Sequence, residues 1–147
     1  MKTGIMCCLA AGMLVATYGI AAAEDDFGIP RYPGAKSDAA TQAICSAPIP
    51  PLFKEREEEA GLTSARRCYR TSDPIAKVAE FYKSQKGLTG GELGDPGGLM
   101  SANLCKSPEG ACNERTVGTN VNIATPWLAN FNMNNDVLIF ITNRVKK

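Results

Sequence analysis

The sequence predicts a small α+β domain: an antiparallel sheet of about three to four strands, with one main helix packed on one face and disulfides as staples. Three observations predict it: one segment has helical periodicity, several have the pattern of strands, and four cysteines follow an apolar leader. We expect a signal peptide over residues 1–23, a proline-rich segment over 24–61 and an α+β core over 62–147, the last two forming one domain.

The first 23 residues have the layout of a bacterial secretory signal. Lys2 supplies a positive charge, residues 4–20 carry no charge, and Ala21-Ala22-Ala23 places small residues before a cleavage site. We expect cleavage between Ala23 and Glu24. The expected product is a periplasmic or secreted protein with no stable membrane insertion after cleavage.

The leader has two other interpretations. An uncleaved membrane anchor is the alternative, because the apolar run approaches the roughly 20 residues that span a bilayer. A lipoprotein is excluded by position: its cysteine would follow the apolar run, whereas Cys7 and Cys8 open it.

The charge balance argues against a nucleic-acid binder. The chain has 16 basic residues (Lys and Arg) and 15 acidic residues (Asp and Glu). Lys2 is the only charged residue within residues 1–23. The remaining chain is therefore formally neutral. Nucleic-acid binding depends on clustered basic residues that neutralise phosphates, so we expect no nucleic-acid partner.

Four cysteines remain after the leader, an even number that predicts two disulfides in an oxidising compartment. Three connectivities are possible. The turn signal Pro108-Glu109-Gly110 lies between Cys105 and Cys112 and favours pairing of these two, which leaves Cys45 with Cys68.

We expect no metal and no cofactor. Zinc sites bring cysteines in close pairs, and residues 24–147 contain no such pair, while the whole chain contains no histidine. The absence of a Cys-x-x-Cys motif also argues against a redox role. The glycine-rich stretch 88–98 follows a helix and lacks Gly-Lys-Ser/Thr, so it predicts a flexible surface connection and not a phosphate loop.

The first half of the domain has weak patterns. Its prolines predict extended chain and turns, with room for short helices over 38–44 and over Lys54–Ala60, the second ended by Gly61. Residues 62–71 predict a strand.

The clearest element is a helix from Pro74 to about Lys86, stopped at Gly87. Asp73 or Ser72 is the expected cap, and the proline suits the first helical position. Apolar residues recur at helical spacing and predict the buried face: Ile75, Val78, Ala79 and Tyr82.

Two strands follow. Residues 117–123 alternate between apolar or small and polar side chains, which is typical of a strand with one buried face. Residues 136–145 are apolar on both faces, which predicts a central strand.

Three short segments resemble small exported bacterial domains of unknown function. They are residues 29–35 with Tyr-Pro-Gly-Ala, residues 68–73 ending in Thr-Ser-Asp, and the helix segment 78–82 ending in Phe-Tyr. The resemblance implies an α+β fold and no activity.

The predicted function is a non-catalytic binding or interaction domain. The alternative function is an enzyme. Because the chain has no histidine, a Ser-His-Asp triad and a Cys-His pair are excluded, and the enzyme would be a hydrolase that uses carboxylate or Ser/Lys chemistry. The acidic candidates each have a structural explanation as a cap, a surface residue or part of a turn: Asp73, Glu80, Glu92, Asp95 and Asp136.

The connection 126–135 holds the candidate contacts for a ligand or partner, namely Trp127, Asn130, Phe131 and Asn132. The expected partner is another envelope protein or a small periplasmic ligand. The alternative is that the two aromatic residues close one end of the core and the asparagines serve turns.

The leader interpretation generates one prediction. Expressed with its own leader in a bacterium, the protein is expected in the periplasm or the medium, starting at Glu24 and containing two disulfides, because the leader directs export and the four thiols then oxidise. Intact-mass measurement before and after thiol labelling checks both points. A product that retains residues 1–23, or that has four free thiols, would contradict it.

Overall fold

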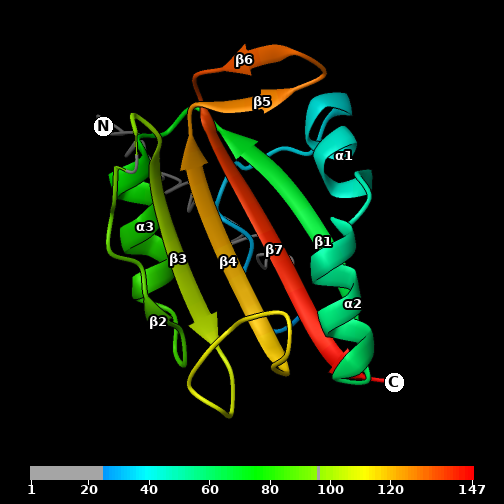
Figure 1. Ribbon diagram of the computed structural model, residues 1–147. Helices are drawn as coiled ribbons and strands as arrows, with labels where there is room; N and C mark the ends of the chain where they lie inside the picture. Colours follow the sequence, from blue (N-terminus) through cyan, green and yellow to red (C-terminus); the bar gives the residue numbers. More distant parts are fainter. Residues whose placement is uncertain (1–24, 96) are drawn as a thin grey trace, which may run out of the picture.

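The computed structural model describes residues 25–95 and 97–147, which form an α+β fold on a five-stranded antiparallel sheet (Figure 1). The strand order is β1-β7-β4-β3-β2. The sheet strands are β1 (Leu62–Thr71), β2 (Thr89–Gly90), β3 (Met100–Lys106), β4 (Gly118–Thr125) and β7 (Val137–Lys146). A separate two-stranded sheet consists of β5 (Trp127–Ala129) and β6 (Asn132–Asn134). The helices are α1 (Ala39–Ser46), α2 (Pro51–Glu59) and α3 (Ile75–Lys83).

The α+β class is confirmed, but the sheet is larger than the predicted three to four strands. Sequence patterns missed β2, β3 and the β5–β6 hairpin. Within β3 only Ala102 and Leu104 are buried, and the residues around them are polar or exposed, so the strand has little apolar alternation. β2 has two residues, which is shorter than any periodic pattern.

The expected central strand is confirmed. β7 pairs antiparallel with β1 on one side and with β4 on the other. Its Ile139 and Ile141 are completely buried on the face that α3 covers, whereas Leu138 and Phe140 point to the opposite face. A strand buried from both sides needs apolar residues at successive positions, which explains its continuous apolar sequence.

Helix α3 packs on one face of the sheet and forms the main core there (Figure 1). Its four residues at helical spacing are all buried, as predicted. They contact large apolar side chains of three strands, namely Leu104, Val121, Ile123, Ile139 and Ile141. Burial of each such side chain contributes about 1.5–3 kcal/mol, so this face supplies most of the apolar stabilisation.

The predicted cap of this helix is wrong. The N-cap position is Pro74, and no side chain there bonds to the helix backbone. Asp73 instead accepts hydrogen bonds from the Tyr32 hydroxyl at 2.6 Å and from Lys77 Nζ at 2.9 Å. Both hydrogen bonds lower the pKa of Asp73, and the bond from the Tyr32 hydroxyl has the larger effect. The carboxylate therefore ties the N-terminal segment to α3.

Helices α1 and α2 lie on the opposite face, over β1, so the prediction of one main helix on one face is also wrong (Figure 1). Asp38 caps α1 in a capping box: its carboxylate accepts from Thr41 N at 3.0 Å, and Thr41 Oγ1 accepts from Asp38 N at 2.8 Å. The segment 24–61 thus contains two helices. Proline did not prevent them, because Pro51 occupies the first turn of α2, where no N–H is needed.

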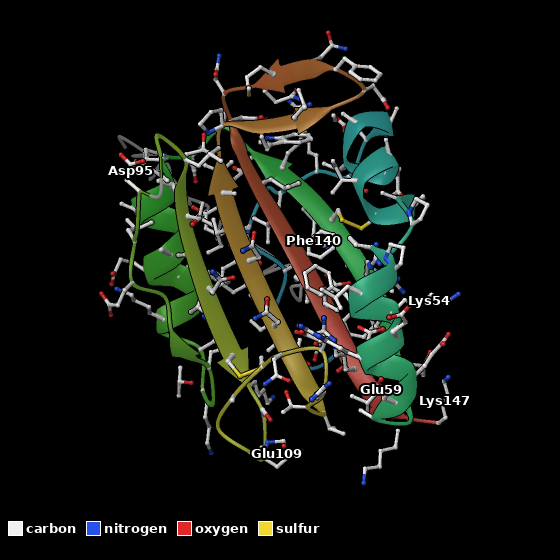
Figure 2. All side chains as sticks on the ribbon, viewed as in Figure 1. Lys54, Glu59, Asp95, Glu109, Phe140 and Lys147 are labelled. Carbon is white, nitrogen blue, oxygen red and sulfur yellow. A yellow bond between two sulfur atoms is a disulfide. The ribbon has the colours of Figure 1, made fainter. Side chains whose placement is uncertain are left out.

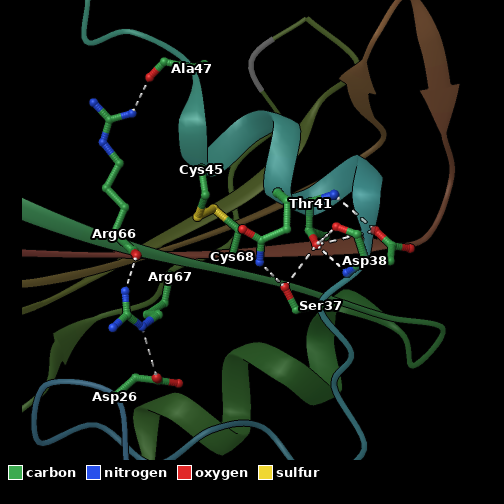
Figure 3. Close-up of a disulfide and its surroundings, with 10 residues drawn as sticks. Asp26, Ser37, Asp38, Thr41, Cys45, Ala47, Arg66, Arg67 and Cys68 are labelled. Carbon is green, nitrogen blue, oxygen red and sulfur yellow. Dashed lines mark hydrogen bonds and ion pairs between the residues drawn. A yellow bond between two sulfur atoms is a disulfide. The ribbon is translucent and has the colours of Figure 1, made fainter.

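Two disulfides close the fold with the pairing that the turn chemistry favoured. Cys45–Cys68 joins α1 to β1 (Figure 3), with a Cα–Cα distance of 5.7 Å. Cys105–Cys112 joins the end of β3 to the loop that leads to β4, with a Cα–Cα distance of 5.5 Å. Both distances lie in the normal range for disulfides.

In the part of the chain that the structure describes, no helix has the length and apolar character needed to cross a membrane. The predicted leader over 1–23 lies outside the described residues.

The two disulfides are expected to differ in their contribution to stability. They are separated by 23 and 7 residues along the chain, and a longer closed loop restricts the unfolded chain more. We expect Cys45→Ala/Cys68→Ala to lower the free energy of unfolding by about 3 kcal/mol and Cys105→Ala/Cys112→Ala by about 2 kcal/mol. Urea titration measures both. Equal losses, or the reverse order, would show that loop length does not decide the effect.

Candidate functional site

The β5–β6 hairpin contains all four candidate contact residues and places them very differently. Trp127 pairs with Asn134, and Leu128 pairs with Met133. Because side chains alternate along a strand, Trp127 and Ala129 face the domain and are buried, while Leu128 and Met133 face away from it. We call Leu128, Phe131 and Met133 the hairpin outer face.

Trp127 anchors the hairpin to the domain. Only 5% of the residue is exposed, and it forms a second core cluster with Ala129 and Leu138, against which Ala40 and Ile44 of α1 pack. Its indole Nε1 donates to Asp136 Oδ1 at 3.0 Å. The tryptophan therefore serves packing, and its ring offers little surface to a ligand.

Arg70 holds the base of the hairpin together. Its Nε donates to Asp136 Oδ2 at 2.5 Å, its Nη1 donates to Asp38 Oδ2 at 3.2 Å, and its guanidinium lies 5.2 Å from the centre of the Trp127 ring. The hydrogen bond to Asp136 is the main cause of the raised pKa of Arg70. The pKa of Asp38 is lowered, chiefly by the backbone N–H of Thr41. One guanidinium thus connects α1, β1 and the start of β7.

Phe131 occupies the tip and is 98% exposed. Asn130 and Phe131 have φ values of 50° and 63° and form the turn between the two strands. Positive φ at both central residues is the pattern of a type I′ turn, for which Asn-Gly is preferred. A phenylalanine at the second position is sterically strained, and its side chain has no aromatic or cation–π contact among the described residues.

The asparagines of the hairpin bond mainly within it. Asn132 Nδ2 donates to the carbonyl of Asn130 at 3.1 Å, and Asn134 Nδ2 donates to the carbonyl of Asn132 at 3.1 Å. Asn130 and Asn132 are exposed. Their amides support the turn, which agrees with the alternative interpretation for the asparagines, whereas Phe131 does not close the core.

Sequence patterns missed a second surface, a pocket of about 190 Å³ between α2 and β7. Phe140 lies on this face of the sheet, beside α2 (Figure 2). The apolar run of β7 predicts burial for every large side chain in it, so nothing in the sequence singles out Phe140.

The acidic candidates for catalysis are placed at separate points. Asp73 and Asp136 bond to the partners described above. Glu80 and Glu92 are exposed and both lie near Lys83 Nζ, at 3.3 and 3.7 Å, and Asp95 is exposed in a loop. Across residues 25–95 and 97–147, no group of three or more Cys, Asp or Glu side chains is arranged to hold a metal ion.

Comparison of the chain with family models, curated proteins and solved structures finds no match. A function must therefore be inferred from the geometry of the chain itself.

The hairpin anchor generates a prediction. Asp136→Ala leaves the buried indole N–H and the Arg70 guanidinium without their acceptor, so we expect a loss of about 2 kcal/mol in the free energy of unfolding. Asp136→Asn keeps an acceptor for the indole and is expected to lose less. Glu109→Ala, in an exposed loop, is the control and should change stability by less than about 0.5 kcal/mol. Urea titration followed by Trp127 fluorescence measures all three, and an Asp136→Ala variant as stable as the control would contradict the anchoring role.

Proposed function

We propose that the chain is an exported, non-catalytic interaction domain that binds another envelope protein through the hairpin outer face. The observation that carries this proposal is Phe131, a large apolar side chain held almost fully in solvent by a strained backbone conformation. Stability alone favours glycine at this position, since an L-residue in the left-handed region costs roughly 1–2 kcal/mol. Strain that folding does not need is a reason to infer a function.

The neighbours of Phe131 support an interface. Leu128 and Met133 are 54% and 61% exposed and lie side by side as a cross-strand pair. Phenylalanine and methionine are enriched where protein surfaces meet. A patch that combines Phe131 and Met133 with the apolar side chain of Leu128 resembles the centre of an interface, where a few residues carry most of the binding energy.

The base of the hairpin is suited to present this patch. Trp127 and Asp136 fix it to the sheet, and α1 supports it from the side. A preordered surface loses less conformational entropy on binding, which favours affinity. Export is supported by the leader-like sequence over 1–23 and by the two disulfides, which persist in oxidising compartments.

The proposal predicts opposite effects of one substitution on stability and binding. Phe131→Gly removes backbone strain and is expected to raise the free energy of unfolding by about 1 kcal/mol. It also removes the proposed central contact. A photo-crosslinking amino acid at position 133 is expected to give a discrete adduct with an envelope protein in cells, and Phe131→Gly in the same chain should abolish it.

Two controls make the result specific. The crosslinker at exposed position Glu109 should give no such adduct. Val145→Ala trims an exposed apolar side chain at the end of β7 that lies away from the hairpin (Figure 1), and it should leave the adduct from position 133 intact. An adduct that survives Phe131→Gly, or equal adducts from positions 133 and 109, would overturn the proposal.

A further inference from the structure

The pocket between α2 and β7 combines apolar walls with two guanidinium groups. We call it the α2–β7 pocket. It has a volume of about 190 Å³, and its lining consists of Ile49, Pro50, Phe53, Glu57, Ser64, Arg66, Phe140, Thr142 and Arg144. Apolar cavities of about 150 Å³ hold one benzene ring, so the space suits a ligand with a single ring. Phe53 and Phe140 supply aromatic surface against which such a ring can pack.

Charged contacts, more than apolar burial, hold the α2 wall of the pocket. Glu57 is the one residue buried within α2. Arg56 forms an ion pair with Glu114, and Arg115 Nη2 lies 3.2 Å from Glu59 Oε2, so two ion pairs connect the helix to the loop before β4. The helix therefore spans this face of the sheet without filling the space beneath it with apolar side chains.

The two arginines of the pocket are not equivalent. Arg144 Nε donates to Glu57 Oε1 at 2.8 Å, and Glu57 also accepts from the Ser64 hydroxyl at 3.1 Å. The charge of Arg144 is thus balanced inside the pocket. Arg66 donates one hydrogen bond, from Nη1 to the carbonyl of Ala47 at 2.8 Å, and forms no ion pair with any carboxylate of the described residues.

Arg66 also lies against the aromatic floor. Its guanidinium carbon is 5.9 Å from the centre of the Phe140 ring. Burial lowers the pKa of Arg66, and nearby Arg144 acts in the same direction, while Glu57 opposes them. The group still remains protonated, because arginine does not lose its proton in proteins. The pocket therefore holds one partly desolvated positive charge in excess, with four N–H donors that Ala47 does not use.

We propose that the α2–β7 pocket binds a small organic anion with a single ring, whose carboxylate or phosphate accepts hydrogen bonds from Arg66 while the ring packs between Phe53 and Phe140. The planar guanidinium matches the two oxygens of such an anion. This site is separate from the hairpin outer face, and neither proposal requires the other.

Titration of the intact ¹⁵N-labelled protein with benzoate, followed by amide chemical shifts, tests the proposal. We expect saturable shifts at Ser64, Phe140 and Thr142 with a Kd of about 1 mM or tighter. Benzyl alcohol has a similar ring without the charge and is expected to bind at least about tenfold more weakly, because hydrogen bonds to charged groups are the stronger ones. Phenyl phosphate in a parallel titration decides which anionic group the pocket prefers.

Neighbouring residues of β1 provide a matched pair of variants. Arg66→Gln is expected to weaken benzoate binding by about tenfold or more. Arg67→Gln removes the same charge from the next position of the strand, whose side chain points to the other face, and should leave binding unchanged. Phe131→Gly should also leave it unchanged, which separates this site from the proposed interface.

Three results would overturn the proposal: no saturable shift with benzoate or phenyl phosphate up to about 10 mM, equal affinity for benzoate and benzyl alcohol, or equal losses in Arg66→Gln and Arg67→Gln. The comparison of benzoate with benzyl alcohol uses the unaltered protein, so it remains decisive even where a variant folds poorly.

Discussion

The position of β7 between β1 and β4 is the constraint on which the rest of the structure depends. β7 is second in the strand order, and β1 has no other partner strand in the described part of the chain, so the sheet is complete only when residues 137–146 pair with both neighbours. One face of β7 contributes Ile139 and Ile141 to the core beneath α3. The other contributes Leu138 to the cluster under the hairpin and Phe140 to the pocket beside α2. β7 thus supports the hairpin from below through Leu138 and lines the α2–β7 pocket through Phe140.

The two faces of the sheet are stabilised by different forces. The face under α3 is packed with apolar side chains, and its stability comes from burial. The opposite face has a small apolar cluster and a disulfide under α1, whereas under α2 it relies mainly on ion pairs. Ion pairs position side chains without excluding water completely, so this face retains space. Apolar packing would have filled the α2–β7 pocket, which explains why the pocket lies on this side of the sheet.

A covalent link indirectly supports the hairpin. The disulfide between Cys45 and Cys68 fixes α1 to β1, and Ile44, adjacent to the cysteine, packs on the cluster that contains Trp127. Arg70 reinforces the same junction by bonding to both Asp38 and Asp136. The base of the hairpin is therefore rigid while its tip is strained and apolar. Proteins commonly place strained or exposed groups on a rigid support where those groups bind something, and accept lower stability in return.

The sequence by itself determined the α+β class, the helix beneath the sheet and the place of β7 between two other strands, and it favoured the observed pairing of the cysteines. Each of these follows from a local signal: a 3.6-residue period, a continuous apolar run, or a turn between two thiols. Only the tertiary structure decided the size of the sheet, the second layer of helices, the hairpin outer face and the α2–β7 pocket. β3 is a strand because β4 pairs with it. Asp73 bonds to Tyr32, which is 41 residues away in the sequence. The sequence gives no reason to distinguish Trp127 from Phe131, yet the first is buried and the second is exposed. Such outcomes depend on which distant segments meet, and no local pattern records that.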